Sequence, residues 1–263
     1  MNRFGAMTLG RYLLVVVLLG LGLLLMCGPD SQGRGSGETL SGDGHSEEAG
    51  SLELDSEMRS EAEAAPGPEA GEGQGPEGYE PLLRAVDGRF TKAGWNHYGP
   101  GYFELDPATG VLTSHGGMGL FWYAAREYGD FDLQLEFMCA SEQTNSGVFL
   151  RVPEVPASDD YIYHSFEIQI DDTGEDVHHT GAAYDAEAPT HKASKPPGEW
   201  NRFNITFEGS RLQVVLNGEK ILDWEAEPRG KVEDFASRGY IGLQNHDDRS
   251  PVYFRNIYVK ELE

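Results

Sequence analysis

Cysteine, basic residues and helical periodicity are all scarce in this chain of 263 residues. Its two cysteines, Cys27 and Cys139, cannot provide a framework of disulfides that would hold the fold together. Lys and Arg number 20 against 44 Asp and Glu. Binding to a phosphate backbone needs a basic surface, so nucleic acid is excluded as a partner. No segment has the sustained period of an amphipathic helix, and no internal repeat is present.

Long hydrophobic runs are equally scarce, and the one present lies near the N-terminus. Tyr12–Met26 contains only apolar residues and glycine, and it follows Arg3 and Arg11. A comfortable membrane span needs about 20 residues, so residues 1–27 predict an export signal first and a membrane anchor second. Cys27 follows the sequence LLLM, where a lipoprotein signal places its lipidated cysteine. We therefore expect an exported protein, periplasmic or at the cell surface, that is tethered to a membrane.

Residues 28–78 have no aromatic residue and consist mainly of Gly, Ser, Glu, Pro and Ala. They contain 13 acidic and 2 basic residues. Such a stretch cannot bury enough apolar surface to offset its ordering entropy, and like charges keep it extended. We expect a disordered acidic linker that holds a folded domain away from the membrane.

Residues 79–263 form the expected folded domain, with 31 acidic and 16 basic residues. Short β-branched and aromatic runs alternate with turn signals throughout, and Asn217-Gly218 is a strong hairpin signal. The sequence thus predicts an all-β fold, a two-sheet antiparallel β-sandwich, with a helical turn at most near Val232–Ala236. Cys139 continues the alternating apolar row that begins at Phe131, so we expect a buried thiol and not a nucleophile. The strands are expected at 102–105, 111–113, 120–123, 131–139, 147–152, 166–170, 203–208, 211–216, 240–244 and 252–260, with a further strand in the hairpin after Gly218.

The stretch Tyr161–Asp172 reads as one strand with two different faces. One face is apolar and includes Ile162 and Ile168. The opposite face carries aromatic rings, acids and an amide without any Lys or Arg: Tyr161, Tyr163, Ser165, Glu167, Gln169 and Asp171. This face fits either a solvated strand or a strand that lines a binding cleft.

The same alternation places Arg151, Gln244 and His246 opposite the core on two other strands. Three strands together then present a polar surface with aromatic rings, which suits a sugar.

A conventional pair of glycosidase carboxylates is not predicted. Glu167 and Asp171 are four residues apart on one strand, or about 13 Å. Retaining pairs need about 5–5.5 Å and inverting pairs about 6.5–9.5 Å, so these two do not fit unless a bulge intervenes. No Gly-x-Ser-x-Gly elbow supports a serine nucleophile.

The segment 172–199 shows no clear strand and contains His178, His179, Tyr184 and Lys195. A structureless segment of this length is usually functional or mobile. Its histidines lie near several acids, so a divalent metal site is an open alternative, although their spacing fits no defined motif. Our expectation is a protein without a cofactor.

Eight motifs carry a resemblance to a known family, in the order YGDFDLQLEF (128–137), NSGVFLR (145–151), FEIQIDD (166–172), HTGAAYD (179–185), KPPGEWNRFNI (195–205), LNG (216–218), GYIGLQNH (239–246) and FRNI (254–257). They resemble the 3-keto-disaccharide hydrolase domain family, long a domain of unknown function with a concanavalin A-like jelly-roll fold. The resemblance runs from about Trp95 to Glu263.

The resemblance implies hydrolysis of 3-keto-glycosides. A ketone at C3 acidifies the C2 proton, so a base can form an enolate that expels the glycosidic oxygen before water adds back. On the matching motifs, Glu167 or His246 is the implied base and His179 the implied acid for the leaving group. Arg151 and Lys195 are implied ligands of the enolate or of hydroxyls. The implied ligands of sugar hydroxyls are Gln169, Asp171, Tyr184 and Gln244.

Two other functions stay open. One is a non-catalytic, lectin-like carbohydrate-binding module at the cell surface, and the other is a structural envelope protein. Aromatic clefts serve binding and catalysis equally, so the sequence does not separate these alternatives. It also leaves the oligomeric state unknown.

Overall fold

The computed structural model describes residues 75–246 and 248–263. The predicted export signal, Cys27 and nearly all of the predicted acidic linker lie outside these residues. Within the described part of the chain, no helix is both long enough and apolar enough to cross a membrane.

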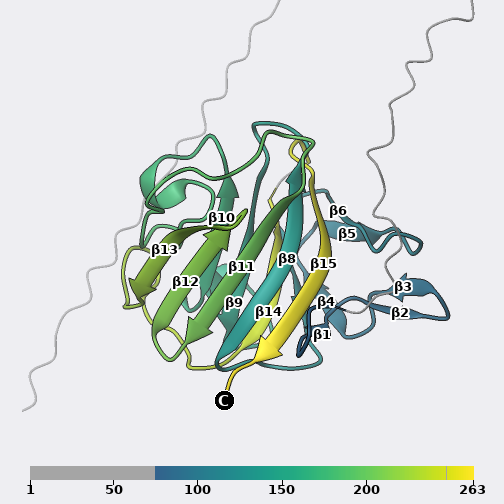
Figure 1. Ribbon diagram of the computed structural model, residues 1–263, viewed down its shortest axis with the longest axis horizontal. Helices are drawn as coiled ribbons and strands as arrows, with labels where there is room; N and C mark the ends of the chain where they lie inside the picture. The colour runs from purple at the N-terminus through teal and green to yellow at the C-terminus, as the bar shows by residue number, and fades with distance from the viewer. Residues whose placement is uncertain (1–74, 247) are drawn as a thin grey trace, which may run out of the picture. The chain divides into compact units, whose positions relative to one another are not determined.

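Two antiparallel sheets are packed face to face, with the larger one nearer the viewer in Figure 1. The larger sheet has eight strands in the order β13-β12-β11-β8-β15-β6-β5, with β1 paired to β15. Its strands are β1 (Glu80–Pro81), β5 (Tyr102–Leu105), β6 (Leu112–His115), β8 (Phe131–Cys139), β11 (Asn201–Glu208), β12 (Arg211–Leu216), β13 (Glu219–Glu225) and β15 (Val252–Glu261).

The smaller sheet has five strands in the order β10-β9-β14-β7-β4. Its strands are β4 (Trp95–Tyr98), β7 (Gly119–Tyr123), β9 (Asn145–Val152), β10 (Phe166–Asp171) and β14 (Tyr240–Asn245). A separate hairpin joins β2 (Arg84–Val86) to β3 (Arg89–Thr91). Two short 3-10 helices complete the elements, η1 (Asp159–Tyr163) and η2 (Asp176–His178).

The main core fills the space between the two sheets, because alternate residues of each strand point inward. Phe203, Ile205 and Phe207 of β11 and Val148 and Leu150 of β9 are fully buried there. Cys139 is buried as predicted, and burial raises the pKa of its thiol to about 12. A thiol held in this protonated form is a poor nucleophile.

A second apolar cluster lies on the other face of the five-stranded sheet, which we call its outer face. Leu120, Trp122, Phe149, Val152 and Tyr161 form this cluster. The ring of Tyr161 in η1 packs edge-on against Phe149, with 5.0 Å between their centroids. The turn η1 therefore covers part of this face and leaves the rest for a site.

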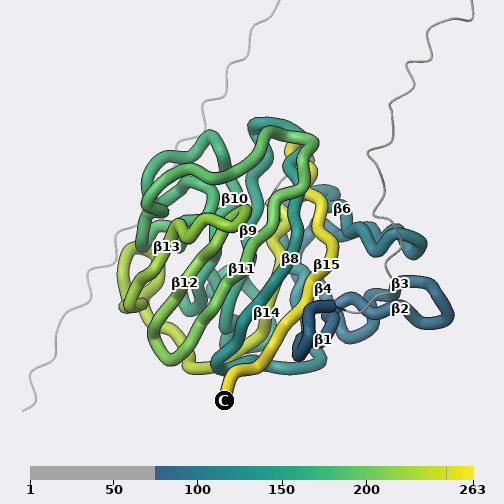
Figure 2. Tube along the Cα trace, viewed as in Figure 1, coloured from purple at the N-terminus to yellow at the C-terminus, as the bar shows by residue number. Residues whose placement is uncertain are grey.

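The first and last strands of the domain lie side by side, as Figure 2 shows for the dark blue and yellow ends of the trace. Glu80 and Pro81 of β1 pair with Val259 and Tyr258 of β15. The amide of Leu82 continues the contact by donating to the carbonyl of Ile257 at 2.9 Å. The sheet thus brings together the two ends of the described chain.

The predicted two-sheet sandwich is confirmed, and β5, β8 and β12 have the predicted bounds. Two local predictions are wrong. The stretch Tyr161–Asp172 is not one strand, because the residues up to Tyr163 form η1 and β10 begins at Phe166. Ile162 consequently lies beside the outer-face cluster and not in the main core. The predicted helical turn at Val232–Ala236 is absent from this described segment.

Candidate functional site

A pocket of about 200 Å³ opens on the outer face of the five-stranded sheet, beside the apolar cluster. Its walls come from β9, β10 and β14, from η1 and from four loops, which precede β7 and follow β10, β13 and β14. The lining residues are Met118, Asn145, Ile162, Glu167, Gln169, Tyr184, Lys231, Gln244 and His246.

Glu167 lies at the base of this pocket with 6% of its surface exposed. Burial raises the pKa of its carboxyl to about 8, against the smaller opposing effect of the Lys231 charge. Its Oε1 atom is buried and has no hydrogen-bond partner among the described residues. An unpaired buried carboxyl destabilises a fold, and perturbed groups of this kind concentrate at functional sites.

Gly147 leaves the space that this carboxyl occupies. It lies on β9, where it pairs with Gln169 of β10. A Cβ atom at position 147 would come within 2.0 Å of Glu167 Oε1. The glycine therefore allows Glu167 to lie across the neighbouring strand at the floor of the pocket.

Two buried amides supply polar groups around Glu167. Gln169 Nε2 donates to Asn145 Oδ1 at a long 3.4 Å, and Gln244 Oε1 has no partner among the described residues. Both glutamines are at most 5% exposed. Amides with spare donor and acceptor capacity suit the hydroxyl groups of a sugar.

The loop after β10 brings Tyr184 to the pocket by pairing along the edge of that strand. The amide of Tyr184 donates to the carbonyl of Glu167 at 2.9 Å, and Gly181 and Ala182 bond to Gln169. The segment 172–199 is thus partly fixed to the sheet, contrary to its structureless appearance in sequence. Lys231 reaches the pocket from the loop after β13 and donates from Nζ to Tyr184 Oη at 3.0 Å.

Arg151 does not line the pocket, so its predicted position on this face is wrong. The residue has a left-handed backbone (φ 54°) where the pairing of β9 with β14 is irregular. Its guanidinium is fully buried over the ring of Phe207, with 3.7 Å from Cζ to the centroid. It donates to the carbonyls of Gly129 and Gly209 and to the carboxylate of Asp130, at 2.8–2.9 Å. Through these contacts Arg151 joins the segments that contain Gly129, Asp130 and Gly209 at the edge of the sandwich.

Three other predicted residues also lie outside the pocket lining. The Asp171 carboxylate accepts hydrogen bonds from Thr173 and Gly174 and closes its own turn. His179 is 3% exposed, and its Nδ1 lies 3.1 Å from the Gly174 carbonyl oxygen. Lys195 Nζ donates to the Trp200 carbonyl at 3.0 Å. None of the three lines the pocket, and their predicted roles stay predictions.

The pocket contains one carboxylate among its lining residues, Glu167. This agrees with the spacing argument against a conventional glycosidase pair. In the described part of the chain, no group of three or more His, Cys, Asp and Glu side chains is placed to hold a metal ion. Of the two histidines that raised this alternative, His178 pairs with Asp185 at 3.1 Å and His179 lies beside the Gly174 carbonyl.

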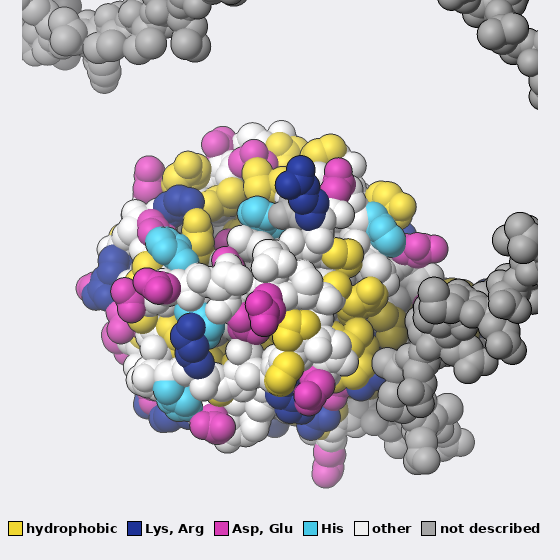
Figure 3. Space-filling model, turned by 90° about the horizontal axis from the view of Figure 1, so that it is seen from above, with side chains coloured by type: hydrophobic (Ala, Val, Ile, Leu, Met, Phe, Trp, Pro, Cys, Tyr) yellow, Lys and Arg dark blue, Asp and Glu magenta, His cyan; other side chains and the backbone are white. Residues whose placement is uncertain are grey.

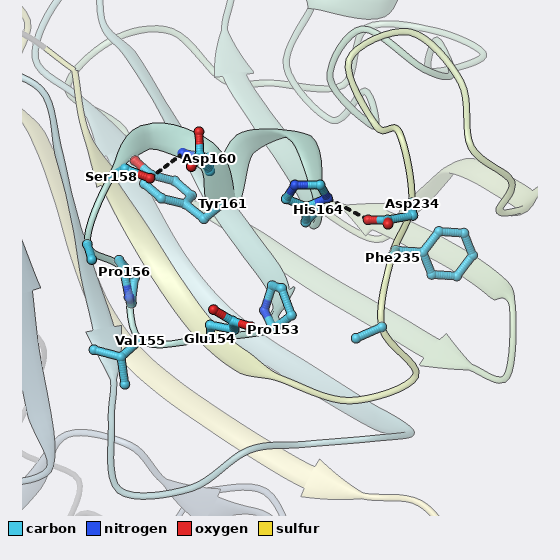
Figure 4. A pocket seen from close by; sticks show the side chains of 12 residues that line it. Pro153, Glu154, Val155, Pro156, Ser158, Asp160, Tyr161, His164, Asp234 and Phe235 are labelled. Atoms are coloured by element: carbon cyan, nitrogen blue, oxygen red, sulfur yellow. Dashed lines mark hydrogen bonds and ion pairs between the residues drawn. The ribbon is translucent and has the colours of Figure 1, made fainter. Parts of the chain in front are cut away.

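A second and larger pocket, of about 570 Å³, lies between the segments 153–164 and 234–236. Figure 4 shows His164 and Asp234 in direct contact where the two segments meet, with 2.5 Å between Nδ1 and Oδ1. Pro153, Pro156 and Phe235 give it apolar walls. It contains none of the sequence-predicted site residues, and the polar groups that converge around Glu167 lie in the smaller pocket.

The structure therefore brings together five predicted site residues: Glu167, Gln169, Tyr184, Gln244 and His246. It adds Lys231, which the sequence did not indicate, because the loop after β13 carries no motif. It also adds Met118 and Ile162 as apolar walls. Their roles stay predictions, while their convergence is a fact of the structure.

Acidic, basic and histidine side chains are intermixed on the face shown in Figure 3, and no continuous basic patch is visible on that face.

Comparisons with known proteins agree with this description. A family model described as the 3-keto-alpha-glucoside-1,2-lyase-like domain matches residues 79–260. Among solved structures, a candidate glycosyl hydrolase from Parabacteroides distasonis is 27% identical, with a TM-score of 0.57, and covers 70% of this chain and 99% of its own. A second one from that organism is 25% identical, with a TM-score of 0.60, and covers 71% and 95%. No curated protein matches the chain.

Proposed function

The chain belongs to the family of 3-keto-alpha-glucoside-1,2-lyase-like domains and is a glycosyl hydrolase-like, carbohydrate-active domain, and we propose that it cleaves 3-keto-glycosides by elimination and hydration. The observation that carries this proposal is Glu167: a buried carboxyl with a raised pKa, an unpaired oxygen and no second carboxylate in its pocket.

The reaction needs one base and not a pair of carboxylates. The ketone at C3 makes the C2 proton acidic, so Glu167 can remove it and leave an enolate. The enolate then restores the ketone, forms a C1–C2 double bond and breaks the bond from C1 to the leaving oxygen. Water afterwards adds at C1 while the proton returns to C2, which completes a hydrolysis.

The other residues lining the pocket fit sugar recognition. Gln169 and Gln244 offer buried amides to ring hydroxyls, and Met118 and Ile162 offer apolar contact to the faces of a ring. His246 lies in the same pocket and is the alternative base.

The test of this mechanism is hydrogen exchange at C2. A 3-keto-glucoside incubated with the protein in heavy water should gain deuterium at C2, and a C2-deuterated substrate should react more slowly where proton transfer limits the rate. Glu167→Gln should abolish exchange and turnover together. Exchange that survives in Glu167→Gln but disappears in His246→Asn would assign the base to His246. Turnover without any exchange would overturn the elimination mechanism.

The pH dependence follows from the same carboxyl. Only the ionised form of Glu167 can accept the C2 proton, and its pKa is raised to about 8. We expect kcat/KM to rise with pH and to level off above about pH 8. Lys231→Met removes the charge that lowers this pKa, so it should move the rise to higher pH.

Binding without turnover is the rival outcome. A protein that binds 3-keto-glucosides or plain glucosides, exchanges no proton and releases no product would be a lectin-like module. The polar groups of the pocket serve such a module equally well.

The same proposal includes an exported and membrane-tethered location, which follows from residues 1–27 and the acidic linker. Wild-type protein should partition with membranes, and Cys27→Ser should be released or keep its signal. Equal membrane partitioning of both, with the signal still attached, would indicate a signal anchor without lipid.

A further inference from the structure

Tyr184 and Lys231 form a contact in the pocket that the role of Glu167 as the base does not explain. Lys231 Nζ donates a hydrogen bond to Tyr184 Oη at 3.0 Å and lies 4.7 Å from the centroid of its ring. The phenol oxygen is therefore an acceptor in this contact, and its own O–H must point elsewhere. No described residue accepts that proton, and both side chains line the pocket that contains Glu167.

The position of this pair relative to Glu167 is set by the backbone. The amide of Tyr184 donates to the carbonyl of Glu167 at 2.9 Å, so the turn that carries Tyr184 lies directly beside β10. Their side chains reach the same pocket from the floor and from the wall.

Lys231 is held in place by an unusually close contact between two loops. Gly230 has a left-handed backbone (φ 60°), and a Cβ atom there would come within 1.7 Å of the Asp185 carbonyl oxygen. Only glycine permits the loop after β13 to approach the Tyr184–Asp185 backbone this closely. Arg229 adds an ion pair to Glu187 at 2.5 Å. These contacts fix the backbone next to Lys231, whose exposed side chain is directed to Tyr184 by its own hydrogen bond.

We propose that Tyr184 is the acid that protonates the leaving oxygen and that Lys231 stabilises the phenolate that this transfer creates. The inference rests on the proposed elimination. As the C1–O bond breaks, the leaving oxygen takes the Tyr184 proton, and the negative charge moves to Oη beside the ammonium group. In the hydration step the phenolate takes a proton from water, hydroxide adds to C1, and the Glu167 carboxyl returns its proton to C2. Both residues end in their starting states.

This assignment replaces His179 as the implied acid. His179 lies outside the pocket lining, and its Nδ1 is engaged with the Gly174 carbonyl. A proton donor must come within hydrogen-bond reach of the atom that it protonates, and Tyr184 lines the pocket whereas His179 does not.

The experiment compares two leaving groups in Tyr184→Phe. An alkyl aglycone leaves through a strongly basic oxygen and therefore needs the acid. A nitrophenyl aglycone leaves as a weakly basic phenolate and does not need it. We expect Tyr184→Phe to lose about 10²- to 10⁴-fold in kcat/KM with the alkyl glycoside and much less with the nitrophenyl glycoside. Exchange of the C2 proton in heavy water should persist. Lys231→Met should show the same dependence on the leaving group with a smaller loss, and Lys231→Arg should restore part of it.

The matched control is Tyr102→Phe, the same chemical change at an exposed residue of the eight-stranded sheet. It should behave like wild type with both glycosides. Equal losses of Tyr184→Phe with both leaving groups, or loss of C2 exchange, would overturn the acid role. Selective loss in His246→Asn, with Tyr184→Phe unaffected, would give that role to His246. Absence of exchange and turnover in wild type would overturn the proposed function, and this inference with it.

Discussion

Two buried charged side chains on neighbouring strands, Arg151 of β9 and Glu167 of β10, occupy contrasting surroundings. Alternation along the chain predicts both on the outer face of the five-stranded sheet. Arg151 instead points into the sandwich edge, where each nitrogen of its guanidinium donates a hydrogen bond. Glu167 keeps the predicted face, and its Oε1 has no partner among the described residues.

The contrast shows how to separate structural from functional charges. A buried charge whose hydrogen bonds are complete stabilises the fold and has nothing left to offer a ligand. A buried charge with an open atom is destabilising, so it needs another reason to be there. An open atom alone is insufficient, because Asp132 Oδ1 and Tyr161 Oη also lack partners among the described residues. The decisive addition at Glu167 is a pocket in which other polar groups converge.

The largest expected effect tests the Arg151 side of this contrast. Arg151→Met should lower the free energy of unfolding by about 3–5 kcal/mol, because it leaves buried carbonyls and the Asp130 carboxylate without their donor. Denaturant unfolding measures this loss. Under conditions where the variant stays folded, turnover should remain near wild type. Lost turnover with unchanged stability would place Arg151 in the site.

The next effect concerns Glu167 and has a defined pH window. The pKa of its carboxyl is about 8 in the fold and 4.5 ordinarily, so unfolding between these pH values releases a proton. The contribution of the Glu167 carboxyl to the free energy of unfolding of the wild type is therefore fully present below pH 4.5, and it is lost as the pH rises through 8. Glu167→Gln has no such loss and should be more stable than wild type by roughly 1–3 kcal/mol above pH 8. Below pH 4.5 the two proteins should unfold alike.

Thermal unfolding at several pH values measures this difference. The exposed Glu142→Gln supplies the matched control and should follow wild type at every pH. A Glu167→Gln protein that is less stable than wild type at high pH would show that the carboxylate has structural partners after all.

A smaller effect on stability is expected at the floor of the pocket. Gly147→Ala places a Cβ atom 2.0 Å from Oε1 and 2.5 Å from Cγ of Glu167, so the whole buried side chain must shift. We expect a loss of about 1–2 kcal/mol from overpacking and a much larger loss of turnover. Gly129→Ala, whose Cβ would meet nothing closer than 3.7 Å, is the control. Normal turnover in Gly147→Ala would remove Glu167 from the role of base.

The smallest effect is expected where a charge is exposed. Arg211 pairs with Asp223 at 2.8 Å on the open face of the eight-stranded sheet, with 58% of its side chain accessible. Water screens such a pair, so Arg211→Met should leave the unfolding midpoint unchanged within error. A shift as large as that of Arg151→Met would erase the distinction between complete buried pairs and surface pairs.

The sandwich was predictable because its strands alternate and end at clear turn signals, as β12 and β13 do around Asn217-Gly218. The start of β10 was not predictable, because the aromatic residues of η1 suit a strand as well as a turn. The backbone of η1 is set by Ser158, whose Oγ accepts from the Asp160 amide. The strands before Tyr102 carry too few apolar residues for a pattern.

The site was predictable where it follows strand alternation and, for the loop residue Tyr184, through the family resemblance. Glu167, Gln169 and Gln244 lie in the pocket because regular strands carry them there. Arg151 fails this rule because one residue with a positive φ turns its side chain to the opposite face. Lys231 depends on the contact of Gly230 with Asp185, which are far apart in sequence, and no local pattern encodes such a contact.

The pairing of β1 with β15 has a consequence for the order in which the domain opens. This contact joins residues near 80 to residues near 258 and closes almost the whole domain into one loop, although β1 is only two residues long. Contacts that close long loops form late in folding, and short edge segments open first. The amide of Leu82 should exchange with solvent deuterium well before the central amides of β8. The domain should therefore fray from its joined ends inward, while the sheet beneath the Glu167 pocket stays closed.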